Sequence, residues 1–339
     1  MLGSLAEDAG IRREDVFQVC VVGNTCMHHL FLGISPASLV HAPYTPAVSE
    51  RLVLNAGDYG LAVQERAELI MLSDIAGYVG ADTCGCLLAI RQDQQEEISL
   101  MIDIGTNGEM VLGNRERMVT CSTAAGPAFE GAKIECGMRG AAGAVDHVKY
   151  EDGKWNYTTV GNKPAVGLCG SGLIDLVAGL LDAGMLDENG VLRSGQEKQG
   201  VFILVPPERG GNERGVYLTQ KDLGEVQLAK AAIAAGIQML MERLGITEDD
   251  ICSVYIAGAF GNYMDPVSAG EIGLLPATLV KKVKPVGNAA GEGAKIALVN
   301  EKEMLEMDEL VRKIEFVELA ASADFQDHFI DELGFETGE

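Results

Sequence analysis

The sequence predicts an α/β protein with a mixed sheet and crossover helices. Short runs of β-favouring apolar residues alternate along the chain with segments whose apolar residues recur every three to four positions. The 42 glycines are spread over all 339 residues, which indicates tight strand-to-helix turns rather than a flexible linker. Because 47% of the residues are hydrophobic, the chain can bury a sizeable core, and we expect two lobes.

The first hundred residues are expected to contain two strands, each followed by a helix. Residues 16–22 form an apolar run typical of a buried strand, and residues 25–32 follow it as a helix. A short strand at 68–72 and a helix at 81–91 repeat this order. This alternation is typical of a sheet with crossover helices.

The rest of the chain is expected to begin with three strands, at 98–104, 109–112 and 118–122, followed by a small-residue helix near 126–134. Residues 149–160 alternate like an exposed hairpin insertion. Residues 193–214 are polar and rich in glycine and proline, which predicts a mobile loop insertion. Helices are predicted at 171–183 and 223–244, and a strand with an amphipathic helix is predicted at 315–335.

The run ISLMIDIGTNGEMVLG at residues 98–113 is the strongest functional signal. Its first strand ends at Asp103, where a carboxylate can hold a metal-bound water, and the glycines after it allow a turn whose amides face an anion. Threonine and asparagine in the turn offer donors to phosphate oxygens. An ordinary hairpin turn explains the Asn-Gly pair equally well. The candidate phosphate-binding residues are Gly105, Thr106, Asn107 and Gly108.

Composition excludes some classes of function. A formal net charge of −24, from 50 acidic and 26 basic residues, argues against nucleic-acid binding and is compatible with docking to a basic partner or with simple solubility. The apolar runs are shorter than the roughly 20 residues that cross a bilayer, and no basic segment precedes an apolar leader. We therefore expect no membrane association and a soluble, cytoplasmic protein.

Cysteines and histidines give no metal-site pattern. The eight cysteines are scattered and are expected to be reduced core residues. Cys84 and Cys86 are too close together to chelate a metal comfortably. His28 and His29 are adjacent at the start of a predicted helix, where neighbouring side chains diverge by about 100°. A shared metal is thus disfavoured, and packing or capping is the preferred interpretation.

Three further glycine clusters follow or border strands. They occupy residues 167–172, 257–262 and 287–291. In an open α/β sheet, such turns are where a ligand meets backbone amides and helix N-termini. The alternative for each cluster is that glycine only allows tight packing, and for a single cluster this alternative is preferred.

The order of these motifs resembles the superfamily of actin, sugar kinases and heat-shock ATPases. More specifically, the chain from residue 16 onward is similar to the ATPase region of the reductive activators of corrinoid proteins. The resemblance rests on ordered motifs, among them VVGNTCMHHLFLGISP, GYVGADT, DIGTNGEMVLG, GPAFEGAKIECGMRG, GLCGSGLIDL, AGAFGNYMDP and VGNAAGEGA. It implies an α/β, ribonuclease-H-like fold of the actin and sugar-kinase type, with an ATP cleft between two such domains.

The resemblance also implies site residues. Residues 103–109 resemble the second phosphate motif and residues 257–261 the adenosine motif, so ATP and Mg²⁺ are the expected cofactors. Asp103 and Glu130 are the expected catalytic residues, and Asp103 is also the expected metal-binding residue. Glu130 has the alternative of offsetting a helix dipole, Lys230 that of a solvated helix face and Phe260 that of a core aromatic. The expected cofactor-binding residues beyond the 105–108 turn are Gly170, Ser171, Gly172, Lys230, Gly258, Ala259, Phe260 and Gly261.

Activators of this family return a cobalt(II) corrinoid to cobalt(I) with ATP and an electron from a ferredoxin-like 2Fe–2S domain. The implied partner is a corrinoid protein, and a homodimer is expected. The Cys-x₄-Cys-x₂-Cys spacing of the 2Fe–2S domain is absent from the sequence, so this chain is not expected to bind that cluster. We expect the C-terminal part of a longer protein, with a two-stranded partial first lobe at 1–97 and a complete second lobe at 98–339.

Two other classes of function remain open. The first is a small-molecule kinase of the same superfamily, in which Asp103 or Glu130 acts as the base. The second is a non-catalytic docking or dimerisation module, in which the glycine turns serve packing alone. Transfer of labelled phosphate would identify the first, and failure to bind nucleotide even with an upstream region restored would favour the second.

Overall fold

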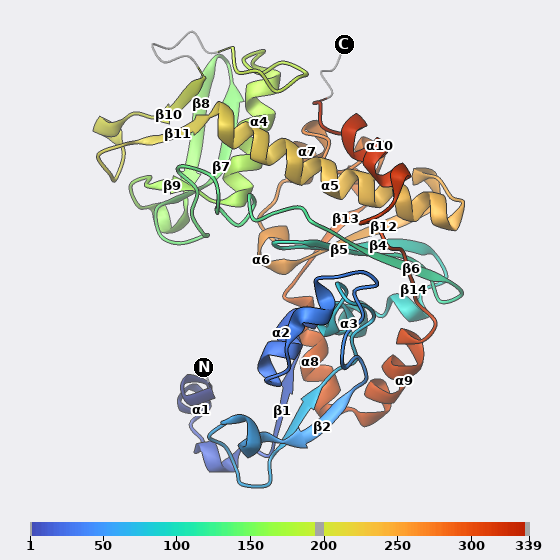
Figure 1. Cartoon of the computed structure of the whole chain (residues 1–339). Coiled ribbons are helices and arrows are strands. Elements are labelled where there is room, and N and C mark those ends of the chain that lie inside the picture. The colour runs from blue at the N-terminus through green and yellow to red at the C-terminus, as the bar shows by residue number, and fades with distance from the viewer. Residues whose placement is uncertain (1, 194–199, 336–339) are drawn as a thin grey trace. The chain divides into compact units, whose positions relative to one another are not determined.

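The computed structural model describes residues 2–193 and 200–335, except for the side chains of Ala259 and Phe260 (Figure 1). The chain forms two compact units. The first unit contains Met1–Glu96, Gly113–Thr120 and Asn288–Phe316, and the second contains Glu97–Leu112, Cys121–Gly287 and Val317–Glu339. The units interleave in the sequence, and the division into lobes at 1–97 and 98–339 stays a prediction.

The first unit contains a three-stranded sheet in the order β1–β3–β2. β1 (Gln18–Val21) pairs in parallel with β3 (Glu68–Met71), and β2 (Leu52–Asn55) pairs antiparallel with β3. The prediction of two strands was wrong. β2 was missed because it is only four residues long and lacks a fully buried residue, so its apolar pattern is weak.

Helices of the first unit pack through glycine contacts. Its helices are α1 (Leu2–Ala9), α2 (Thr25–Phe31), α3 (Ala81–Ile90), α8 (Ala289–Val299) and α9 (Glu301–Val311). A Cβ atom added to Gly293 of α8 would lie 1.9 Å from the carbonyl oxygen of Gly85 in α3. The helix backbones therefore touch at a point where no larger residue fits.

A six-stranded sheet has the order β13–β12–β4–β5–β6–β14. β12 (Ile251–Ala257) is parallel to both β4 (Ile98–Ile104) and β13 (Val283–Gly287). β14 (Glu315–Phe316) is parallel to β6 (Met118–Thr123), and β5 (Gly108–Gly113) lies between β4 and β6. β4 has the predicted bounds, which confirms the strand that ends beside Asp103.

A second, three-stranded sheet of the second unit has the order β8–β7–β9. Its strands are β7 (Ala144–Glu151), β8 (Lys154–Thr159) and β9 (Gly167–Leu168). β7 and β8 confirm the predicted hairpin, and its two turn residues, Asp152 and Gly153, have φ values of 52° and 75°. Positive φ at both positions is typical of a type I′ turn.

The second unit has five α-helices among its described residues: α4 (Gly170–Asp182), α5 (Gln220–Leu244), α6 (Gly258–Gly261), α7 (Pro266–Glu271) and α10 (Ala323–Asp331). α5 begins at a capping box formed by Thr219 and Asp222 and ends at Gly245, whose φ is 71°. α10 packs along α5 (Figure 1). Gln238 of α5 donates to Glu332 at 2.6 Å.

Two sequence predictions for this unit were wrong. The predicted helix near 126–134 is a series of turns, because Gly126, Gly131 and Lys133 have φ values of 79°, 80° and 65°, which no α-helix accommodates. The predicted loop at 193–214 contains β10 (Val201–Val205), which pairs with β11 (Val216–Thr219). Residues 194–199 of that loop lie outside the described residues.

Across the described ranges, no helix is both long and apolar enough to cross a membrane.

Candidate nucleotide site

The β4–β5 turn is closed by backbone hydrogen bonds. The Gly105 amide donates to the carbonyl oxygen of Asn107 at 2.9 Å, and the Gly126 amide donates to the carbonyl oxygen of Thr106 at 2.9 Å. The Thr106 hydroxyl donates to a carboxylate oxygen of Glu130 at 2.6 Å. The turn is therefore held to the loop after β6, and two predicted site residues, Thr106 and Glu130, are brought together across 24 positions of sequence.

Asp103 lies opposite Ala257 in the parallel pairing of β4 with β12. The residue after Ala257 is Gly258, which has a φ of 89°. A Cβ atom added to Gly258 would lie 3.0 Å from Oδ1 of Asp103. Carboxyl ends of neighbouring parallel strands meet at one edge of a sheet, and here they bring the predicted phosphate and adenosine motifs together.

The predicted site glycines differ in what surrounds them. A Cβ added to Gly105 would be 3.8 Å from its nearest neighbour in the described structure, the carbonyl oxygen of Asn107, which is an ordinary van der Waals distance. At Gly108 the added atom would be 2.9 Å from the Thr123 hydroxyl, and at Gly261 it would be 2.4 Å from the Ile256 side chain. Gly108 and Gly261 are therefore required for packing, whereas Gly105 leaves room beside the turn.

Gly126 faces open space and was not predicted as a site residue. Its φ is 79°, and no atom of the described residues comes within 4 Å of an added Cβ. Its amide supports the Thr106 carbonyl, as described above. The Gly126-Pro127 pair is a sequence signal of a turn, but only the fold shows which other loop that turn contacts.

The residues around 170–172 face β7. The Ser171 hydroxyl donates to the carbonyl oxygen of Asp146 at 2.8 Å, and a Cβ added to Gly172 would lie 2.3 Å from the carbonyl oxygen of Val145. Gly170 is the first residue of α4, so all three residues belong to the first turn of this helix. These contacts explain Ser171 and Gly172 by packing, and a nucleotide role for the three stays a prediction.

Lys230 is buried in α5, with 1% of its surface exposed. Its Nζ lies 3.8 Å from a carboxylate oxygen of Glu332 and 5.6 Å from the centroid of the Phe335 ring. The alternative of a solvated helix face was therefore wrong. Contact with a nucleotide stays a prediction for Lys230, as it does for Ala259 and Phe260, whose side chains lie outside the described structure.

An Asp–His pair beside Ser171 was missed by the sequence analysis. Nδ1 of His147 lies 3.1 Å from Oδ2 of Asp175, which also accepts from the Val148 amide at 3.2 Å. Burial raises the pKa of Asp175. This effect outweighs the hydrogen bonds from Ser268, Val148 and His147, which lower the pKa. The two residues are 28 positions apart, so no local motif marks the pair.

Comparison with known families decides the classification. A family model described as the C-terminal domain of RACo, the ASKHA domain, matches residues 97–339, and a model described as the RACo middle region matches residues 1–95. The chain belongs to the RACo family. ASKHA domains are actin-like ATPase domains, so the match confirms the predicted fold class. β4 and Asp103 lie at the start of the matched ASKHA region.

Three relatives extend this result. The corrinoid activation enzyme RamQ of Eubacterium limosum is 35% identical over 345 residues, covering 97% of this RACo-family chain and 58% of RamQ. A Co(II) methylated amine-specific corrinoid protein reductase of Methanosarcina barkeri is 29% identical over 303 residues, covering 82% of the chain and 54% of the relative. A solved reductive activator for corrinoid, iron-sulfur protein has a TM-score of 0.91 and 37% identity, covering 98% of the chain and 55% of that structure. The chain thus spans a little over half the length of these relatives.

Proposed function

We propose that this chain binds Mg²⁺–ATP at the β4–β5 turn, and that within a longer protein it couples ATP to the reduction of a corrinoid protein. The observation that carries the nucleotide proposal is the approach of Gly258 to Asp103 at the ends of two neighbouring parallel strands. The absence of a side chain at Gly258 lets its backbone approach this carboxylate, and a Cβ added to Gly105 would be no closer than 3.8 Å to its neighbours, so a carboxylate and glycine backbone meet at the strand ends.

The residues of the turn suit the chemistry of a metal-bound phosphate. Asp103 would hold Mg²⁺ through its carboxylate, directly or through water, because Mg²⁺ prefers oxygen ligands and keeps several waters. The Gly105 amide already donates to the Asn107 carbonyl oxygen, so the Thr106 amide and the Asn107 side chain would donate to phosphate oxygens. Gly258 and Gly261 would border the adenosine. The bound Mg²⁺–ATP would supply the free energy for a thermodynamically uphill electron transfer.

The Thr106–Glu130 hydrogen bond has a chemical consequence for this proposal. A hydroxyl has one proton to donate, and that of Thr106 is donated to Glu130. For a phosphate oxygen to accept from the Thr106 hydroxyl, this hydroxyl must therefore turn away from Glu130, whose carboxylate would then accept from water or another donor. The hydrogen bond between Thr106 and Glu130 would thus be present without phosphate and broken when phosphate binds to Thr106.

The rest of the proposed function concerns the longer protein. The relatives are named as a corrinoid activation enzyme, a corrinoid protein reductase and a reductive activator, which supports a corrinoid protein as the partner. The electron would come from a 2Fe–2S domain outside this chain, and the protein would act as a homodimer. ATP can drive an uphill transfer only if nucleotide and partner bias the same conformational equilibrium.

Calorimetric titration with Mg²⁺ and a non-hydrolysable ATP analogue tests the nucleotide proposal. The parent chain should bind, Asp103→Ala should lose binding, and Asp58→Ala, which removes an exposed carboxylate of the first unit, should bind like the parent. Equal binding by Asp103→Ala and the parent would contradict the site. Binding of a cobalt(II) corrinoid protein that does not change with the nucleotide would contradict the coupling, even if the nucleotide site is correct.

A further inference from the structure

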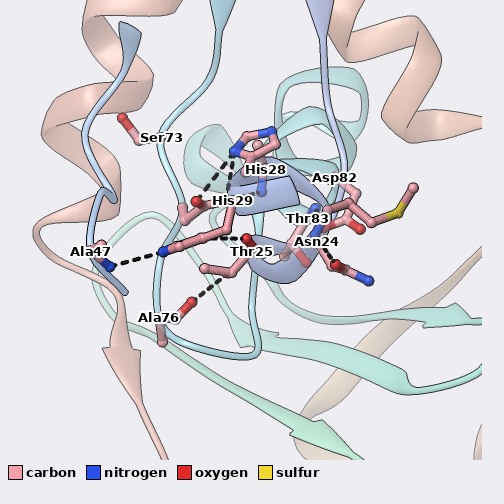
Figure 2. Close-up of polar contacts among 12 residues, drawn as sticks. Asn24, Thr25, His28, His29, Ala47, Ser73, Ala76, Asp82 and Thr83 are labelled. Atoms are coloured by element: carbon pink, nitrogen blue, oxygen red, sulfur yellow. Dashed lines mark hydrogen bonds and ion pairs between the residues drawn. The ribbon is translucent and has the colours of Figure 1, made fainter. Parts of the chain in front are cut away.

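The adjacent histidines of α2 are held by hydrogen bonds within the first unit. Nδ1 of His29 lies 2.7 Å from the carbonyl oxygen of Thr25, and Nε2 accepts from the Ala47 amide at 2.9 Å (Figure 2). Nδ1 of His28 lies 3.2 Å from Oδ2 of Asp74. Both rings are buried, which confirms the preferred packing interpretation of this histidine pair. An edge strand of the second unit, in contrast, has polar groups that face solvent.

β8 is the longest edge strand among the described residues. It lies at one edge of the sheet β8–β7–β9 and has six residues, four of which are exposed (Figure 1). Proteins commonly protect an edge with proline, with an irregular register or by keeping the strand short, because an unpaired edge pairs readily with another strand. β13 contains Pro285, the register of β10 shifts after Ile203, and β14 has two residues. β8 has none of these protections.

Every second residue of β8 has backbone groups that point away from β7. Glu151 and Lys154 flank the two-residue turn, and across such a turn their backbones bond to each other. Lys154 therefore faces β7, and so does every second residue after it. The Gly143 amide, which donates to the Val160 carbonyl oxygen at 3.0 Å, continues this alternation. The residues whose amide and carbonyl groups face outward are Trp155, Tyr157 and Thr159.

The outward groups are unused and are held in place. Among the described residues, no backbone hydrogen bond outside the β7–β8 pairing involves them. The ring centroid of Trp155 lies 4.8 Å from that of Tyr150 and 4.9 Å from that of Phe202, which anchors the strand. Tyr157 lies on the same face as Trp155 and is 38% exposed. A rigid edge of this kind loses little conformational entropy when it pairs.

We propose that β8 pairs antiparallel with β8 of a second copy of this chain, about a two-fold axis at Tyr157. This inference rests on the homodimer of the proposed function and assigns its interface. Tyr157 would lie opposite Tyr157 of the second copy, and Trp155 opposite Thr159. Each of these pairs exchanges two backbone hydrogen bonds, so every outward group of both strands is used. A shift by two residues leaves either Trp155 or Thr159 without a partner.

The uncharged composition of the strand favours a second copy as the occupant. The formal net charge of −24 makes two copies repel each other on average. Residues 155–159 read WNYTT and contain no charged side chain, so this pairing sets no like charges opposite each other. On the other face of the paired strands, Asn156 would lie opposite Thr158 of the second copy. The strand is thus complementary to itself in both backbone and charge.

Sedimentation equilibrium of the full chain tests this interface. The parent should form dimers. Tyr157→Lys sets two lysines opposite each other at the two-fold axis and should raise the dimer dissociation constant by about tenfold or more. Asn156→Lys is the matched control, because it adds the same charge at the neighbouring exposed position but opposite Thr158, and its dissociation constant should stay close to that of the parent. Mixing Tyr157→Lys with Tyr157→Glu should restore dimers, since opposite charges then face each other.

Two results would overturn the proposal. If Tyr157→Lys dimerises like the parent, the interface is wrong and the homodimer of the proposed function stands. If the parent is a monomer, both are wrong, and the edge is left for a strand of another protein. Should Tyr157→Lys not fold, hydrogen exchange of the parent decides. The amides of Trp155, Tyr157 and Thr159 should exchange more slowly as the protein concentration rises, and exchange independent of concentration in a dimeric parent would overturn the pairing.

Discussion

Both units place glycines and an aspartate where parallel strands end, yet they use them differently. In the first unit, a Cβ added to Gly80 would lie 2.5 Å from the Cα of Asn24, and Asp74 is occupied by His28 and the Ala81 amide. In the second unit, a Cβ added to Gly258 would lie 3.0 Å from Oδ1 of Asp103, whereas one added to Gly105 would be no closer than 3.8 Å to a neighbour, the carbonyl oxygen of Asn107. Gly80 and Gly258 are therefore both closely packed, whereas Gly105, in the turn after β4, has space for a small side chain.

The largest expected effect is on stability, and it distinguishes the closely packed Gly80 from Gly105. Gly80→Ala forces a methyl group against backbone and should destabilise the first unit by about 1–3 kcal/mol. Gly105→Ala places its methyl group at an ordinary van der Waals distance from its nearest neighbour and should change stability by less than about 0.5 kcal/mol. Urea unfolding of both variants measures the difference. Equal losses of stability in Gly80→Ala and Gly105→Ala would contradict this distinction.

The next effect is on nucleotide affinity and concerns the two aspartates. Asp103→Asn should weaken binding of the Mg²⁺–ATP analogue by tenfold or more, which is about 1.4 kcal/mol, because it removes the charge facing the metal. Asp74→Asn should leave the affinity unchanged and instead lower the unfolding free energy by about 1–3 kcal/mol, since it weakens a buried hydrogen-bonding group. Calorimetry and urea unfolding of the same two variants distinguish these results. If only Asp74→Asn lowered the affinity for the Mg²⁺–ATP analogue, Asp74 rather than Asp103 would be the aspartate of the nucleotide site.

A smaller effect is expected for the Thr106 hydroxyl. Thr106→Val removes the donor to Glu130 and should cost about 0.5 kcal/mol of stability, because one exposed hydrogen bond is lost. Affinity for the analogue should fall by roughly fivefold, which corresponds to about 1 kcal/mol. Thr159→Val, which removes a hydroxyl of β8 that donates to the Lys163 carbonyl oxygen, is the matched control and should bind like the parent.

The smallest effect is a pH dependence in the first unit. Burial raises the pKa of Asp74 above its ordinary value of 3.8, so the folded state takes up a proton before the unfolded state as the pH falls. The stability of the parent relative to Asp74→Asn should therefore rise as pH falls through the raised pKa toward 3.8, and should fall again as pH rises. Urea unfolding of both proteins over this window checks the sign. A relative loss of stability on acidification would contradict it.

Most of the strand and helix framework could be predicted because its signals are local. The run of apolar residues before Asp103 defines β4, and the regular spacing between 220 and 244 defines α5. β2 was missed because its four residues carry a weak pattern, and the helix near 126–134 was wrong because positive φ values at glycines are not visible as a break in apolar spacing.

The role of each glycine could not be predicted, because it depends on residues far away in the sequence. Gly172 packs against Val145 and Gly108 packs against Thr123. A Cβ added to Gly105 would have its nearest neighbour at 3.8 Å, and one added to Gly126 would have none within 4 Å among the described residues. The burial of Lys230 likewise depends on α10 and the segment after it, about 100 residues further along. Sequence motifs locate the candidate site, but only tertiary contacts separate packing glycines from those that leave space.

Hydrogen exchange with and without a saturating Mg²⁺–ATP analogue tests the central claim most directly. Amide exchange in peptides that cover residues 98–113 should slow when the analogue binds, because the turn amides would donate to phosphate. The matched peptide around Gly80, residues 72–90, serves as the comparison, and we expect a smaller change there because its amides are already occupied by Asp74, Asp82 and the Gly23 carbonyl. Saturable binding without any protection in residues 98–113 would contradict the account.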